Sequence, residues 1–159
     1  MCIRDRPTLV PPNVEFLVDD ITSSWVYTQR FDYIHSRAIT VGIKDWASLV
    51  DQCWQNLEPG GYVEFQEYHM PFASDDDTMK NGPAFLLWNE NMKTATTKVG
   101  THLDAILRVP PILMERGFVN LGTAATKWPI GPWPRGKREK KMGELMERVS
   151  SRTGAADVK

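Results

Sequence analysis

Polar side chains follow three short apolar segments of the sequence, each with the composition of a β-strand. The residues at the three ends are Asp19 and Asp20, then His35, Ser36 and Arg37, and finally Glu67, Tyr68 and His69. Where strands run parallel beneath helices, ligands bind beyond their carboxyl ends. A carboxylate there can accept hydrogen bonds from an amine, and a histidine can hold or move a proton. These residues are therefore candidates for contact with a small molecule.

Three strands and one amphipathic helix are expected to position these side chains. The strands are predicted at residues 14–18, 31–35 and 62–67, because FDYIH is largely apolar and YVEFQE alternates apolar with polar residues. Apolar residues spaced by three or one positions predict a helix from Trp46 to Leu57. The Pro-Gly-Gly sequence at 59–61 is expected to end this helix and turn the chain. Alternating strand and helix predict an α/β fold with a mostly parallel sheet.

The second half of the chain is expected to hold an insertion before the pattern resumes. Residues 68–109 exceed the few that normally join a strand to a helix, which indicates an inserted cap over the site. A helix is predicted from about residue 83 to 107, with a break at Gly100. Pro110 and Pro111 can open a short helix that Gly117 ends, and residues 118–121 are predicted to follow as a strand.

Both ends of the chain are expected to lie outside the domain. Residues 1–6, MCIRDR, look like translated adapter sequence, so residues 1–12 are expected to be a non-native or disordered lead. The domain is expected to span residues 13–143, followed by a frayed polar tail at 144–159. The abrupt start after the lead suggests an incomplete gene model.

Charge and composition exclude several classes of protein. The 19 Lys and Arg residues and 20 Asp and Glu residues give a net charge of -1, which argues against a domain built to hold nucleic acid. No apolar run approaches the roughly 18 residues that a membrane span needs, so no membrane association is expected. Two cysteines and three histidines without ligand spacing predict neither a disulfide framework nor a metal site. A cytoplasmic or nuclear protein is the resulting expectation.

An ordered set of motifs resembles a known family. The set comprises NVEFLVDDI followed by Trp25, then FDYIHSR, WASLVDQCWQNLEPGGYVEFQE, ERGF and KWPIGPWP. In this order the motifs resemble the class I S-adenosylmethionine-dependent methyltransferases, and more narrowly the fungal LaeA-like branch. The resemblance covers nearly all of residues 12–143. It implies a Rossmann-like methyltransferase fold, in which residues 14–18, 31–35, 62–67 and 118–121 are the third to sixth strands.

The resemblance also implies roles for single residues. Asp20, preceded by Asp19, matches the acidic residue that hydrogen-bonds the adenine amino group of S-adenosylmethionine, and the Ile21 backbone N–H would meet a ring nitrogen. His35 and Ser36 would lie near the methionine part and the transferred methyl group. Trp25 adjoins the adenine loop. The insertion at 68–109 would line the pocket of the methyl acceptor, which is a small molecule or a protein.

Some features of the resembled family have no counterpart in the sequence. No glycine-rich ExGxG loop precedes residue 13, and the acid that grips the ribose at the end of the second strand is missing. The first two strands and the last strand are therefore expected to be absent. A truncated methyltransferase with little or no affinity for S-adenosylmethionine is the expectation.

Several alternatives remain open at this stage. His35 is a general base or a structural hydrogen-bonding residue, and Trp25 is a core residue or a cation–π partner of the sulfonium. For the whole chain, the alternatives to a methyltransferase are two. One is a degenerate methyltransferase that binds regulatory proteins without catalysis. The other is a nucleotide-dependent oxidoreductase of related fold.

Overall fold

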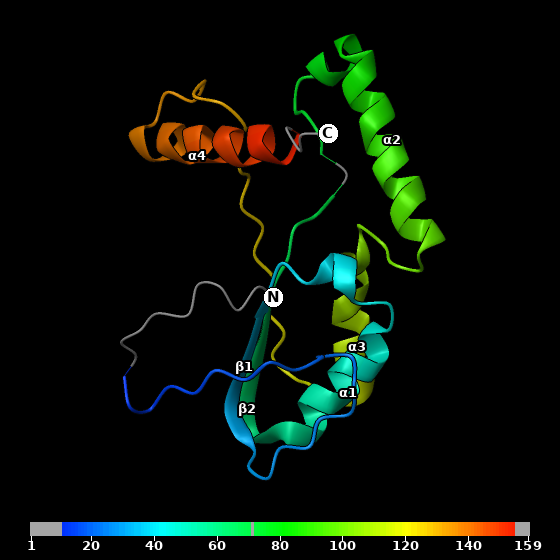
Figure 1. Cartoon of the computed structure of the whole chain (residues 1–159), viewed down its shortest axis with the longest axis vertical. Helices are drawn as coiled ribbons and strands as arrows, with labels where there is room; N and C mark the ends of the chain where they lie inside the picture. Colours follow the sequence, from blue (N-terminus) through cyan, green and yellow to red (C-terminus); the bar gives the residue numbers. More distant parts are fainter. Residues whose placement is uncertain (1–10, 71, 155–159) are drawn as a thin grey trace. The chain divides into compact units, whose positions relative to one another are not determined.

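The computed structural model describes residues 11–70 and 72–154, and the chain divides after Asn120 into two units. Figure 1 shows the order of the elements along the chain. In the first unit they are β1 (Phe31–Arg37), the 3-10 helix η2 (Thr40–Gly42), α1 (Trp46–Asn56), β2 (Leu57–Gln66), η3 (Thr78–Asn81), α2 (Pro83–Lys98), η4 (Ala105–Arg108) and α3 (Val109–Arg116). The second unit contains α4 (Lys137–Gly154).

A β–α–β unit lies at the centre of the first unit. β1 and β2 pair in parallel, with Ile34 opposite Val63, and α1 connects them. Asp45 caps the N-terminus of α1, because its side chain accepts a hydrogen bond of 2.9 Å from the Ser48 N–H. These elements confirm two predicted strands, the predicted helix and the parallel pairing. They are compatible with an α/β Rossmann-like fold.

The predicted turn at residues 59–61 is wrong. α1 ends at Asn56 and β2 begins at once with Leu57, so the three residues lie inside the strand. Gly60 has a φ of +87°, and the pairing with β1 shifts register between Phe31 and Tyr33. Glycine adopts this backbone conformation without steric penalty, so it forms an irregularity in the strand rather than a turn.

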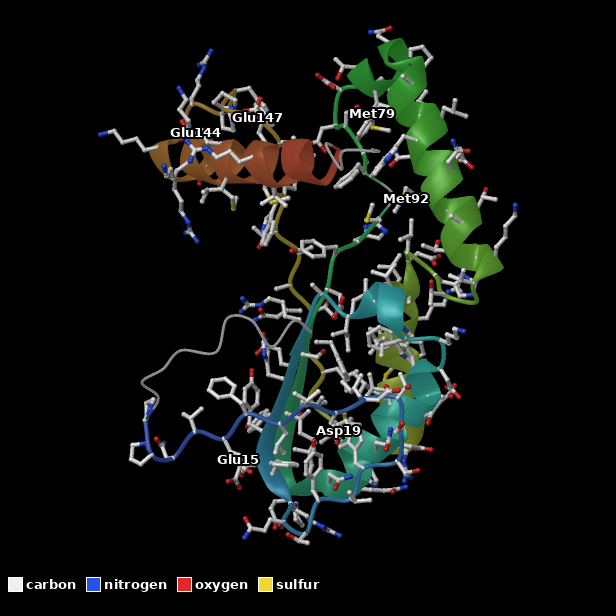
Figure 2. The ribbon with its side chains drawn as sticks, viewed as in Figure 1. Glu15, Asp19, Met79, Met92, Glu144 and Glu147 are labelled. Atoms are coloured by element: carbon white, nitrogen blue, oxygen red, sulfur yellow. The ribbon has the colours of Figure 1, made fainter. Side chains whose placement is uncertain are left out.

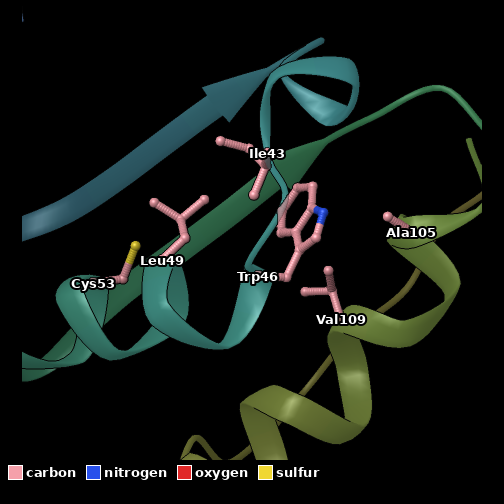
Figure 3. Close-up of a cluster of buried hydrophobic side chains, with 6 residues drawn as sticks. All are labelled: Ile43, Trp46, Leu49, Cys53, Ala105 and Val109. Atoms are coloured by element: carbon pink, nitrogen blue, oxygen red, sulfur yellow. The ribbon is translucent and has the colours of Figure 1, made fainter. Parts of the chain in front are cut away.

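The core lies between α1, the β1–β2 pair and the segment that forms η4 and α3. Figure 3 shows its buried cluster, which consists of Ile43, Trp46, Leu49, Cys53, Ala105 and Val109. Ile34, Val63 and Phe65 from the two strands pack against this cluster, and the rings of Trp46 and Phe65 meet edge to face at 5.5 Å. Burial raises the pKa of the Cys53 thiol to about 12. Cys53 is therefore a neutral core residue rather than a nucleophile.

Two other predicted strands are not formed. Residues 14–18 adopt no regular secondary structure, and Val14 and Val18 are 41% and 66% exposed. Residues 118–121 are also irregular. An apolar run becomes a strand only beside a partner that takes its N–H and C=O groups, and in the described part of the chain the sheet contains β1 and β2 alone.

The helices α2, α3 and α4 follow the β–α–β unit along the chain. α2 begins at Pro83 and ends at Lys98, so the predicted start and the break at Gly100, which has a φ of +83°, are confirmed. The predicted continuation to residue 107 is wrong, because residues 101–104 are not helical and the 3-10 helix η4 begins at Ala105. Gly117 ends α3 with a φ of +115°. That residues 68–109 cover a site stays a prediction. α4 runs to Gly154 and so includes residues 144–154. That the end of the chain at 144–159 is frayed stays a prediction. Of the expected lead at residues 1–12, residues 1–10 lie outside the described residues.

Within the described chain, no helix is both long enough and apolar enough to pass through a lipid bilayer.

Leu49→Ala tests the role of the α1 core. Leu49 is 3% exposed, so its truncation leaves a cavity and is expected to lower the free energy of unfolding by about 2–5 kcal/mol. Urea denaturation followed by circular dichroism measures this change. Val41→Ala, at a position that is 58% exposed, serves as the control and should change stability by less than about 0.5 kcal/mol. Equal effects of the two substitutions would contradict this description of the core.

Candidate functional site

A tight turn places the Asp20 carboxylate at the surface. The backbone N–H and the hydroxyl of Thr22 donate to Asp20 Oδ1 at 2.9 and 2.7 Å, and the Ser23 N–H donates to the Asp20 carbonyl at 3.0 Å. The hydrogen bond from the Thr22 backbone, and then that from its hydroxyl, hold the pKa of Asp20 below its usual value. Asp20 is therefore a fixed, ionised acceptor at neutral pH.

Asp19 supports this turn from the preceding segment (Figure 2). Its Oδ1 accepts a hydrogen bond of 2.8 Å from the Asp20 N–H. The two neighbouring carboxylates therefore have different partners. Asp19 accepts from the backbone N–H of Asp20, whereas Asp20 accepts from Thr22.

Gln52 of α1 anchors the turn to the core. Its side-chain oxygen accepts from the Trp25 N–H at 2.8 Å, and its amide nitrogen lies 3.4 Å from the Ile21 carbonyl. The indole N–H of Trp25 donates to the same carbonyl at 3.1 Å. Ile21 and Trp25 are half-buried and pack against the core cluster. The contacts of Trp25 favour its interpretation as a packing residue.

A groove of about 270 Å³ lies beside the turn. It is bounded by the turn, by the loop before α1 and by the first turns of α1. Its lining residues are Ile21, Thr22, Gly42, Ile43, Lys44, Asp45, Ser48, Leu49 and Gln52. Three of these residues have apolar side chains and five have polar or charged ones, so the groove is more polar than most small-molecule sites, which are lined mainly by apolar side chains.

His35 and Ser36 lie on opposite faces of the sheet, because successive side chains of a strand alternate. His35 is exposed, and its ring stacks on Tyr33 with centroids 6.1 Å apart. Ser36 Oγ is buried and has no hydrogen-bond partner among the described residues. The structure therefore does not bring the two side chains to one face. Among the described residues, the His35 ring forms no hydrogen bond, so the structure gives no support to the interpretation of His35 as a structural hydrogen-bonding residue.

Comparison with known proteins identifies the family. A sequence model described as a methyltransferase domain matches residues 2–99. The chain belongs to the class I methyltransferases, in the fungal LaeA-like branch. The match begins inside the segment that was expected to be a non-native lead.

The relatives of this methyltransferase chain are fungal proteins. It is 34% identical over 141 residues to methyltransferase pytC of Aspergillus terreus. The aligned residues are 89% of the chain and 44% of that protein. It is 33% identical to the probable methyltransferase tdiE of Emericella nidulans, over 78% of the chain and 39% of the relative. The secondary metabolism regulator laeA of Coprinopsis cinerea is 41% identical over 59 residues, which are 36% of the chain and 15% of that protein. No solved structure gives a significant match.

Two residues of this candidate site were missed in the sequence, and a third was named for another role. Thr22 stands two positions after Asp20, a spacing at which a Thr often donates back to an Asp, so it could have been found. Gln52 adjoins the apolar stripe of α1, but nothing in its spacing reveals a partner 31 residues away. Glu67 was expected to contact a ligand, but its carboxylate instead accepts hydrogen bonds from Ile39 and Thr40.

Two carboxylates of the acidic loop at residues 75–77 bind residues that follow them in the chain. Asp76 Oδ1 accepts from the backbone and hydroxyl of Thr78 at 3.2 and 2.7 Å, and Asp77 pairs with Lys80 at 3.0 Å. Across the residues that the structure describes, no three His, Cys, Asp or Glu side chains are grouped closely enough to hold a metal ion.

Thr22→Val tests the cause of the lowered Asp20 pKa. The substitution removes the hydroxyl donor and keeps the backbone donor, so the pKa of Asp20 should rise toward its usual value without reaching it. Titration of the carboxyl carbons by NMR measures the change. Thr78→Val is the matched control, because Thr78 binds Asp76 with the same two donors. It should raise the pKa of Asp76 and leave that of Asp20 unchanged, and the opposite pattern would contradict the assignment.

Proposed function

We propose that this chain supplies the adenosyl-binding side of an S-adenosylmethionine-dependent methyltransferase. Members of the methyltransferase domain family generally use this cofactor. The observation that carries the proposal is the pairing of an ionised acceptor, Asp20, with the adjacent N–H of Ile21 at the border of the groove. Among the described residues, no acceptor binds that N–H.

The two groups suit the edge of an adenine ring. Adenine offers an exocyclic amine as donor and a ring nitrogen as acceptor, so it requires an acceptor and a donor side by side. Asp20 Oδ1 already receives two hydrogen bonds from Thr22. A carboxylate has about four acceptor positions, so capacity remains for the amine. The apolar side chains of Ile43 and Leu49 line the same groove and would contact the ring face.

His35 and Ser36 are proposed to act near the other end of the cofactor, each from a different face of β1. When bound, S-adenosylmethionine supplies a methyl group on a sulfonium, and methyl transfer requires chiefly in-line positioning of the acceptor. A base is needed only where the acceptor loses a proton, and the exposed imidazole of His35 is the candidate for that step. The buried Ser36 Oγ, which lacks a partner in the described chain, is the candidate to hydrogen-bond the methionine part.

The segment that contains α2 is proposed to bind the methyl acceptor. Support comes from Phe72, Phe85 and Trp88, whose rings lie within 25° of parallel at centroid distances of 5.8–5.9 Å. Such rings suit a planar, apolar surface. The acceptor is a small molecule or a protein. Because one relative is named a secondary metabolism regulator, a regulatory role in secondary metabolism is the second candidate function.

Asp20→Ala tests the proposed adenine contact. The substitution leaves the adenine amine without its acceptor, so it should weaken binding of S-adenosylmethionine by about 1–3 kcal/mol, or roughly 5- to 150-fold. The measurement is isothermal titration calorimetry on the longest natural protein that contains this chain.

Asp76→Ala is the matched control for this test. Asp76 forms the same pair of hydrogen bonds with a following threonine, but Thr78 does not line the groove, whereas Ile21 and Thr22 beside Asp20 do, so loss of Asp76 should leave the affinity unchanged. An unchanged affinity in Asp20→Ala would show that the adenine contact is wrong. No binding of the cofactor by the unsubstituted protein would refute the proposed function and favour a non-catalytic binding module.

A further inference from the structure

The Glu67 carboxylate, at the end of β2, binds the loop that follows β1. Its Oε1 accepts a hydrogen bond of 3.0 Å from the Ile39 N–H. Its Oε2 accepts from the Thr40 N–H at 3.0 Å and from the Thr40 hydroxyl at 2.6 Å. Thr40 is 6% exposed, so the second oxygen binds at a largely buried position. Three hydrogen bonds to one ionised group are stronger than three between neutral groups.

The loop lacks a capping side chain of its own. η2 starts after Ile39, and no side chain within the helix caps its first N–H groups. Ala38, just before it, has a φ of +56°, a left-handed conformation that is unfavourable for an L-residue. The Ala38 N–H donates to the Gln66 carbonyl at 3.0 Å, so β2 holds the loop at this point as well. Such a backbone persists only where its surroundings enforce it.

The same loop forms one wall of the groove. The Gly42 N–H donates to the Ile39 carbonyl at 2.8 Å, and the Ile43 N–H donates to the Thr40 carbonyl at 3.4 Å. Ile43 is 3% exposed and belongs to the core cluster, and it lines the groove together with Ile21. The two residues that Glu67 holds are therefore the ones on which the Gly42–Ile43 wall is built.

We propose that Glu67 is a positioning residue, whose carboxylate holds the loop after β1 in the shape that forms one wall of the groove. Glu67 contacts the backbone of the loop and acts on a ligand only through it. The identity of the ligand rests on the proposed function above. The role of the Glu67 carboxylate in holding the loop and the wall does not depend on which ligand the groove binds.

Glu67→Gln and Glu67→Ala separate the charge of the side chain from its presence. Glutamine keeps one oxygen for Thr40, but its NH₂ group would face the Ile39 N–H, whereas alanine removes every acceptor. In the full chain, exchange of the Ile39 and Thr40 amide hydrogens with deuterium is measured by NMR. We expect exchange at least about tenfold faster in Glu67→Ala and an intermediate change in Glu67→Gln. Glu58→Gln, an exposed carboxylate of the same strand, is the control and should change nothing.

A second measurement follows the wall itself. NMR cross-peaks between the methyl groups of Ile43 and those of Leu49 should weaken in Glu67→Ala and remain in Glu58→Gln. The dissociation constant for S-adenosylmethionine should rise about tenfold in Glu67→Ala, which corresponds to one lost charge-assisted hydrogen bond. Thr40→Val removes the hydroxyl donor alone, so it should raise the dissociation constant by a smaller factor. It replaces Glu67→Ala in these measurements if Glu67→Ala does not fold.

The outcomes distinguish this proposal from the proposed function. Unchanged amide exchange in Glu67→Ala and Glu67→Gln would overturn it, as would faster exchange with an intact Ile43–Leu49 contact. If the unsubstituted protein does not bind S-adenosylmethionine, the proposed function fails. The exchange and cross-peak measurements then still decide whether Glu67 holds the wall.

Discussion

Burial of one side of α1 is the interaction on which the rest of the described site depends. Leu49 and Cys53 contribute to the core from this side, and Trp46 contacts Phe65 of β2. Because α1 is fixed by this packing, Gln52 on the adjoining side of the helix has a fixed place. Gln52 in turn holds the Ile21–Trp25 segment, which adopts no strand or helix of its own. The position of the Asp20 carboxylate is thus set by a helix that follows it in the chain.

The face of the β1–β2 pair that points away from α1 carries polar side chains. Tyr33 and Glu64 are joined by a hydrogen bond, and Gln66 donates to Glu64 at 2.6 Å. The bond between Tyr33 and Glu64 raises the pKa of the phenol and is the main cause of the lowered pKa of the carboxylate. These side chains are exposed. The face that packs on α1 is apolar apart from Ser36, so the two faces differ as the alternation along a strand requires.

The sequence was most informative where one segment determines its own structure. The apolar spacing from Trp46 predicted α1, and Gly117 marked the end of α3, because helix patterns and caps are local. The prediction failed for residues 14–18 and 118–121, where a strand would need a partner that lies elsewhere in the chain. The side chains of His35 and Ser36 point to opposite faces of β1, and that both residues serve one site stays a prediction. Motif order identified the family, but the hydrogen bonds of Gln52 and Glu67 depend on distant residues.

Both carboxylates that shape the groove act on backbone groups, and they do so in different ways. Asp20 is fixed by a threonine two positions away, so its turn forms from local sequence. Glu67 binds residues 27 and 28 positions earlier, so the shape of its loop depends on the pairing of β1 with β2. The turn on the Ile21 side of the groove thus has a locally determined conformation, although α1 sets its position, whereas the loop on the Ile43 side depends on the paired strands. A substitution that disturbs strand pairing should therefore alter the Ile43 wall before it alters the Asp20 turn.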